Sequence, residues 1–119
     1  MEKVVKSEVI EGLIEVAQAW QDFDHKKMDQ IVHQVAEESA EFRLVPPEDK
    51  VATLDELGDV LVNAMRLIVE LDANTLEAVR MIADRKATRR MTDAVSGQCN
   101  KDKVAERKEA EAVVKFMGL

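Results

Sequence analysis

Apolar residues recur every three to four positions along most of this 119-residue chain, which is the spacing that places them on one face of an α-helix. In the first such segment, Val9, Leu13 and Trp20 fall on one stripe, together with Val16 or Ala17. The stripes and their interruptions predict five helices, at about residues 7–23, 28–44, 53–71, 74–90 and 101–117.

The interruptions between these segments contain residues that typically end or begin helices. Pro46 and Pro47 should stop the second helix, because proline lacks the amide hydrogen that a helix interior needs. Thr53 and Glu56 have the spacing of a capping box and predict the start of the third helix. Residues 96–100 predict a loop. The expected fold is all-α, an antiparallel four-helix bundle core with an additional C-terminal helix, in a single domain of residues 1–119.

Composition supports this fold class and limits the expected location and binding partners of the protein. Two prolines and four glycines give few turns for a β protein. Cys99 is the sole cysteine, so no internal disulfide forms, and a cytoplasmic location is expected. The first residues lack the apolar core of a signal peptide, and no apolar run is long enough to span a membrane. The net charge of −7 argues against binding to nucleic acid or to anionic membranes.

The second predicted helix carries acids where its periodicity calls for an apolar residue. Its apolar stripe runs through Ile31, Val35 and Phe42, and Glu38 occupies the position between them. A carboxylate on an apolar stripe has a large desolvation cost unless a cation or hydrogen-bond donors compensate it. Glu41 lies three residues further on and therefore beside Glu38 on the helix surface.

The third predicted helix repeats the pair of acids with the same spacing, as Glu56 and Asp59. Here a simpler interpretation is available, because these acids continue into a polar stripe with Asn63, Arg66 and Glu70. That stripe has the appearance of a solvated face on which Glu56 closes the capping box with Thr53.

The two pairs together predict a metal site. Two neighbouring antiparallel helices with acids at this spacing direct four carboxylates into one space, where their charges repel. A hard divalent cation compensates them, and Mg²⁺ prefers oxygen ligands while retaining waters for substrate phosphates. Mn²⁺ is a possible substitute. The predicted ligands are Glu38, Glu41, Glu56 and Asp59.

At these residues the chain resembles the MazG-like nucleoside triphosphate pyrophosphohydrolases, an all-α family. The family signature is E-x-x-E followed by E-x-x-D, and this chain has Glu38-Ser39-Ala40-Glu41 and then Glu56-Leu57-Gly58-Asp59. The segment ELGDVLV and the segment of residues 71–91 are also similar to family motifs. The resemblance covers about residues 8–91, which makes residues 7–91 the catalytic helical core and leaves 92–119 as a loop and terminal helix.

The resemblance further implies a phosphate-binding set on the fourth predicted helix. Lys86 and Arg90 match the basic positions of the family's closing motif, whereas Asp84 stands where asparagine is more usual. Lys86 and Arg90 lie four residues apart on one face, so together they could hold a phosphate chain. Arg89 belongs to the same basic cluster, although cations also favour a helix C-terminus for electrostatic reasons alone.

The implied activity is Mg²⁺-dependent cleavage of an NTP or dNTP to the monophosphate and pyrophosphate, in the house-cleaning of nucleotide pools. Glu38 or Glu37 would orient or deprotonate the attacking water. Trp20 is a candidate for stacking on the base, although Trp20 and Phe23 also fit a core position. The resemblance implies a homodimer or homotetramer.

Two other interpretations remain at the level of sequence. A phosphoribosyl-ATP pyrophosphohydrolase shares an acidic helix motif, but it usually has a Tyr-His pair where this chain has Val62-Asn63. A non-catalytic helical adaptor or assembly protein would use the acids as solvated faces and the terminal helix as an interface.

Overall fold

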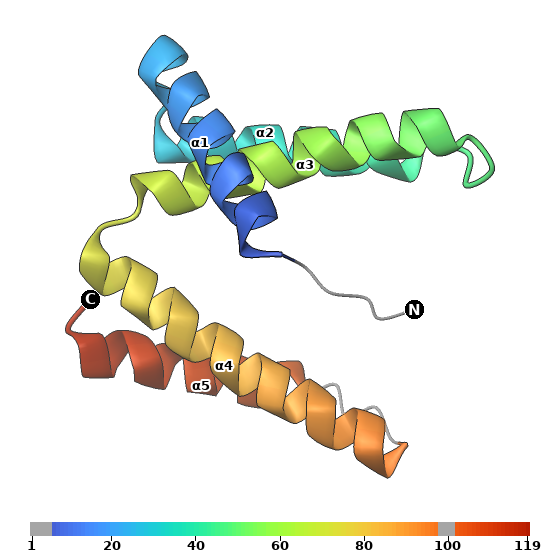
Figure 1. The fold of residues 1–119 in the computed structure, drawn as a ribbon. Helices are drawn as coiled ribbons and strands as arrows, with labels where there is room; N and C mark the ends of the chain where they lie inside the picture. Colours follow the sequence, from blue (N-terminus) through green and yellow to red (C-terminus); the bar gives the residue numbers. More distant parts are fainter. Residues whose placement is uncertain (1–5, 98–101) are drawn as a thin grey trace. The chain divides into compact units, whose positions relative to one another are not determined.

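The computed structural model describes residues 6–97 and 102–119, and all of the regular structure in these residues is helical. The described residues form five helices: α1 (Ser7–Asp24), α2 (Met28–Arg43), α3 (Lys50–Glu70), α4 (Ala73–Ser96) and α5 (Lys103–Met117) (Figure 1). The all-α prediction is confirmed. Cys99 and most of the loop predicted at residues 96–100 lie outside the described residues.

Two helix ends differ from the sequence prediction. The third helix begins at Lys50, and the Asp49 side chain accepts a hydrogen bond from the Ala52 amide at 3.1 Å. Thr53 lies inside the helix and its hydroxyl donates to the Asp49 carbonyl, so the predicted capping box with Glu56 is wrong. The fourth helix continues past Arg90 to Ser96, because no helix breaker occurs before Gly97, which caps it with a φ of 73°.

The contacts divide the chain into two units, residues 1–70 and residues 71–119, and each is described by itself. In the first unit α1 and α2 both pack against α3. Figure 1 shows α2 and α3 running side by side in opposite directions, with α1 crossing them. In the second unit α4 and α5 form an antiparallel pair (Figure 1). The four-helix bundle and the single domain stay predictions.

The two buried residues of α3 both belong to its polar stripe. Asn63 and Arg66 are 9% and 4% exposed, whereas Leu54 on the predicted apolar stripe is 69% exposed. The interpretation of the polar stripe as a solvated face is therefore wrong for Asn63 and Arg66. Helix periodicity identifies two faces of a helix, but it cannot show which of them a neighbouring polar helix will cover.

Arg66 is buried and has two partners on α1. Its Nε donates to Gln21 Oε1 at 2.7 Å, and its Nη2 forms an ion pair with Asp24. Gln21, which is also buried, donates in turn to Glu70 at 2.9 Å and to the Lys26 carbonyl at 3.1 Å. This network joins α1 to α3 and allows the charge of Arg66 to be buried, because a buried charge is tolerated only when it is paired and hydrogen-bonded.

Among the described residues, no helix combines the length and the apolar character that a membrane span requires.

Replacing Arg66 with alanine should destabilise the chain strongly. The variant would leave the partners Gln21 and Asp24 without their donor, and breaking such a buried pair typically costs on the order of 3 kcal/mol. Urea denaturation followed by circular dichroism measures the free energy of unfolding. Arg80→Ala is the matched control, because Arg80 forms exposed ion pairs with Glu77 and Asp84 and should cost much less. Equal losses in the two variants would contradict the structural role of Arg66.

Candidate functional site

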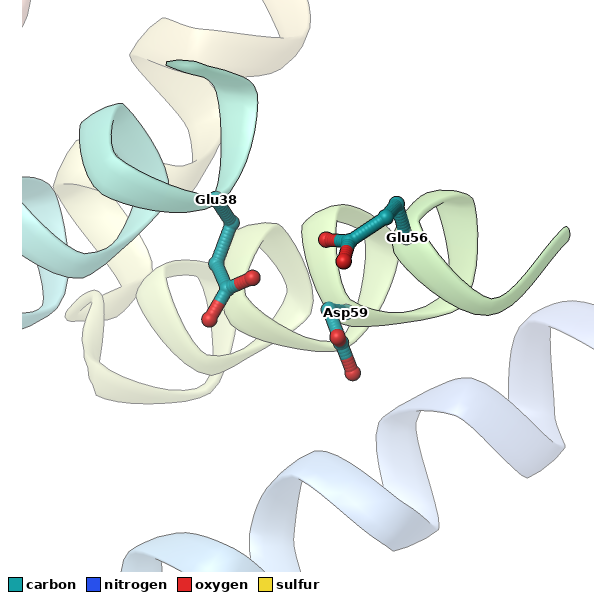
Figure 2. Close-up of side chains that lie close together, drawn as sticks. All are labelled: Glu38, Glu56 and Asp59. Atoms are coloured by element: carbon teal, nitrogen blue, oxygen red, sulfur yellow. The ribbon is translucent and has the colours of Figure 1, made fainter. Parts of the chain in front are cut away.

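Three of the predicted acids converge between α2 and α3. One carboxylate oxygen each from Glu38, Glu56 and Asp59 lies within 4.8 Å of the other two. Figure 2 shows Glu38 extending from α2 towards α3, which contributes the other two carboxylates. The antiparallel packing of α2 and α3 brings the two halves of the motif together, and the i,i+3 spacing places Glu56 and Asp59 on the same side of α3. We refer to these three residues as the acidic trio.

Two oxygens of the acidic trio are buried without a hydrogen-bond partner. They are Glu38 Oε2 and Glu56 Oε2. The other oxygen of Glu38 accepts a hydrogen bond from Gln34 Nε2 at 2.9 Å, and Gln34 Oε1 accepts one from Lys26 Nζ at 3.0 Å. Within residues 6–70, no ion pair involves any member of the acidic trio. Buried carboxylate oxygens without a donor are costly, so this geometry favours a cation.

The carboxyl groups also act on one another electrostatically. Burial is the largest cause that raises the pKa of Glu56, and the charges of Asp59 and Glu38 add to it. Burial and then the charge of Glu38 raise the pKa of Asp59. Glu41 is exposed and lies outside the acidic trio, yet the charge of Glu38, followed by burial and the charge of Glu56, raises its pKa. All four predicted ligands thus belong to one electrostatic cluster.

Glu37 has a different environment from Glu38. Its carboxylate lies 2.8 Å from His33 Nε2, one helix turn away, and both side chains are largely exposed. Glu37 does not join the acidic trio.

A cavity of about 330 Å³ adjoins Asp59. Its lining comes from α1, α2, α3 and the turn between α1 and α2, and includes Trp20, Lys26, Gln34, Asp59, Asn63 and Arg66. Trp20 is half exposed and meets Phe23 edge to face, with ring centroids 5.8 Å apart. Phe23 is 77% exposed, so the alternative that these aromatics belong to a buried core does not hold in the described chain.

The basic residues predicted to bind phosphate are engaged with acids of the second unit. Lys86, Arg89 and Arg90 all lie within ion-pair distance of Glu106 on α5, and Arg89 also pairs with Glu109. Asp84 pairs with Arg80 at 2.5 Å and is exposed. Glu106 is not recognisable from the sequence, because its place on a strongly charged terminal helix does not distinguish it from the neighbouring acids.

Sequence reasoning also missed the support behind the acidic trio. Gln34 donates a hydrogen bond to Glu38 and accepts one from Lys26, and Gln21 accepts one from Arg66. Gln34 lies one helix turn before Glu38 on the same face, a spacing that could have identified it.

Comparison with family models, with curated proteins and with solved structures gave no match to this chain.

The raised pKa values predict how stability depends on pH in metal-free buffer. A carboxyl group whose pKa is higher in the folded chain binds more protons when folded, so its contribution to stability falls as pH rises through the interval above its ordinary pKa. Glu41, Glu56 and Asp59 should therefore destabilise the chain at pH 7 relative to about pH 5. Carboxyl groups with lowered pKa values, such as Asp24 and Glu106, stay ionised over this interval and do not counteract the effect.

Thermal unfolding of the wild type and of Glu56→Gln, each at the two pH values in the presence of a chelator, isolates this contribution. We expect the variant to lose less stability than the wild type between about pH 5 and pH 7, because one repelling charge is gone. An identical pH dependence in both chains would contradict the electrostatic cluster.

Proposed function

We propose that this protein is a Mg²⁺-dependent nucleotide pyrophosphohydrolase that cleaves an NTP or dNTP to the monophosphate and pyrophosphate, as its resemblance to the MazG-like family implies. The observation that carries the proposal is the pair of buried, unpartnered oxygens of Glu38 and Glu56 beside the Asp59 carboxylate. House-cleaning of nucleotide pools is the biological role that accompanies this activity.

The residues present fit Mg²⁺ better than a softer metal. The acidic trio offers only carboxylate oxygens, which are hard ligands, and it includes no histidine or cysteine. Glu38, Glu56 and Asp59 would hold the ion, with Glu41 as a further ligand on the exposed side. Bound Mg²⁺ would neutralise charge on the triphosphate and lower the pKa of a coordinated water.

A carboxylate of the site would accept the proton of the attacking water. In the reaction, the oxygen of water adds to one phosphorus of the α–β linkage, the bridging P–O bond breaks, and the water proton passes to a carboxylate. Glu38 is the better placed of the two candidates for this proton, because it belongs to the acidic trio whereas Glu37 is paired with His33. The bond between Gln34 and Glu38 fixes the orientation of that carboxylate.

The cavity next to Asp59 suits the nucleoside part of the substrate. Trp20 supplies an aromatic face for a base, and Lys26, Gln34 and Asn63 supply polar groups that can select among bases and sugars.

The basic residues of α4 would neutralise the leaving pyrophosphate. Lys86 and Arg90 are the main candidates, with Arg89 and Asp84 beside them. This role depends on the predicted four-helix bundle, because the basic side chains must reach a triphosphate that is held at the carboxylates.

A homodimer or homotetramer is also part of the proposal. Leu54, Leu57 and Leu61 form an apolar stripe along α3 that is 37–69% exposed, and a partner subunit could cover it.

Chromatography of the products tests the reaction class directly. With Mg²⁺, the chain should convert at least one NTP or dNTP to the monophosphate and pyrophosphate, and a chelator should abolish turnover.

Glu38→Gln should lower kcat/KM on the order of 100-fold or more, because it removes both a ligand and the proton acceptor. Glu11→Gln, an exposed change on α1, is the matched control. Full activity in Glu38→Gln would refute its assigned role, and binding of no nucleotide would favour a helical adaptor.

Replacing Lys86 and Arg90 with alanine should lower kcat/KM by about 100-fold, because the developing charge of pyrophosphate loses its compensation. Calorimetric titration with Mg²⁺ should give the wild-type affinity, since both residues belong to the second unit and not to the acidic trio. Unchanged kinetics in this double variant would remove α4 from the mechanism.

A further inference from the structure

One carboxylate of α5, that of Glu106, lies within ion-pair distance of three cationic side chains of α4. Glu106 Oε1 lies 2.6 Å from Arg89 Nη1 and 3.9 Å from Arg90 Nη2, and Glu106 Oε2 lies 3.5 Å from Lys86 Nζ. The Glu106 side chain is 18% exposed, so it reaches these cations from within the contact between the two helices. Glu109 contributes a second carboxylate, paired with Arg89 Nη2.

An open groove runs beside this cluster. Its volume is about 660 Å³, and α4 contributes Lys86 to its lining. The rest of the lining belongs to α5 and consists of Lys103, Val104, Glu106, Arg107, Lys108, Ala110 and Glu111. In a chain of net charge −7, this local excess of cations is unusual. Such a groove suits a flexible ligand that carries several negative charges, since a chain of phosphates can contact separate cations in succession.

We propose that the groove between α4 and α5 is a binding site for an oligophosphate, and that Glu106 occupies the position of one phosphate until such a ligand displaces it. On this view α5 is a built-in competitor, because Lys86 both lines the groove and pairs with Glu106, so that a phosphate bound to Lys86 would compete with the carboxylate of α5. The inference rests on the proposed function in one respect, which is that the natural ligand would be the triphosphate of a nucleotide.

The electrostatics of Glu106 fit the role of a competitor. Its partial burial raises its pKa, but Lys86 and Arg89 outweigh that effect and leave the pKa below its ordinary value. Glu106 therefore stays ionised at neutral pH and competes with any anion through the whole physiological range. A phosphate chain carries more charge and more acceptor oxygens than one carboxylate, so it has the advantage at sufficient concentration.

The test is calorimetric titration of the full chain with inorganic tripolyphosphate, in a chelator and at low salt. Glu106→Gln should bind about three- to tenfold more tightly than the wild type, because it removes a like charge from the site of the anion. Glu77→Gln is the matched control, because it changes the charge of the chain by the same amount. Among the described residues, Glu77 of α4 forms an ion pair with Arg80 alone. This control variant should bind tripolyphosphate within about twofold of the wild-type affinity. Equal affinity in the wild type and Glu106→Gln, or an equal gain in Glu77→Gln, would overturn the proposal.

A second measurement does not depend on the folding of the variant. Tripolyphosphate added to the wild type should speed amide hydrogen exchange in residues 103–117, because displacing Glu106 weakens the contact of α5 with α4. Unchanged or slower exchange at saturating ligand would contradict displacement. Neither measurement requires turnover, so tighter binding by Glu106→Gln in a chain that cleaves no nucleotide would uphold this inference while refuting the proposed function.

Discussion

The burial of Asn63 and Arg66 on the polar side of α3 is the constraint on which the first unit depends. A helix that turns its polar stripe towards its neighbours must find a partner for every charge that it buries. At one end of the stripe, Arg66 finds its partners in Gln21 and Asp24 of α1. At the other end, Glu56 and Asp59 meet another carboxylate, Glu38, instead of a cation. Within residues 6–70, the protein's own side chains thus pair the charge of Arg66, whereas no ion pair involves the acidic trio.

Neighbouring side chains hold part of the acidic trio in place. Arg66 anchors α3 to α1, and Gln34 positions Glu38 from the preceding turn of α2. The orientation of the Glu38 carboxylate is therefore set by a side chain of the protein itself. The closeness of these carboxylates makes the cluster unfavourable when all of its groups are ionised, which is consistent with the raised pKa values of Glu41, Glu56 and Asp59.

Much of this arrangement could be predicted from the sequence. Where the sequence predictions failed, the physical cause is clear. The position of Glu38 on an apolar stripe and the repeated spacing at Glu56 and Asp59 predicted that the acids meet. The orientation of α3 could not be predicted, because its apolar stripe through Leu54 competes with a polar stripe whose partners lie far away in sequence. The role of Glu106 was equally hidden, since only the packing of α5 on α4 distinguishes it from other acids of that helix.

The most direct test of the central claim, that the acidic trio binds a divalent cation, is titration with Mn²⁺ followed by electron paramagnetic resonance. The signal of free Mn²⁺ is lost when the ion binds, and the measurement requires neither substrate nor turnover. The wild type should remove at least one equivalent of free Mn²⁺, added Mg²⁺ should release it, and Asp59→Asn should abolish this binding. Equal binding by the wild type and Asp59→Asn, or no saturable binding by either, would contradict the claim.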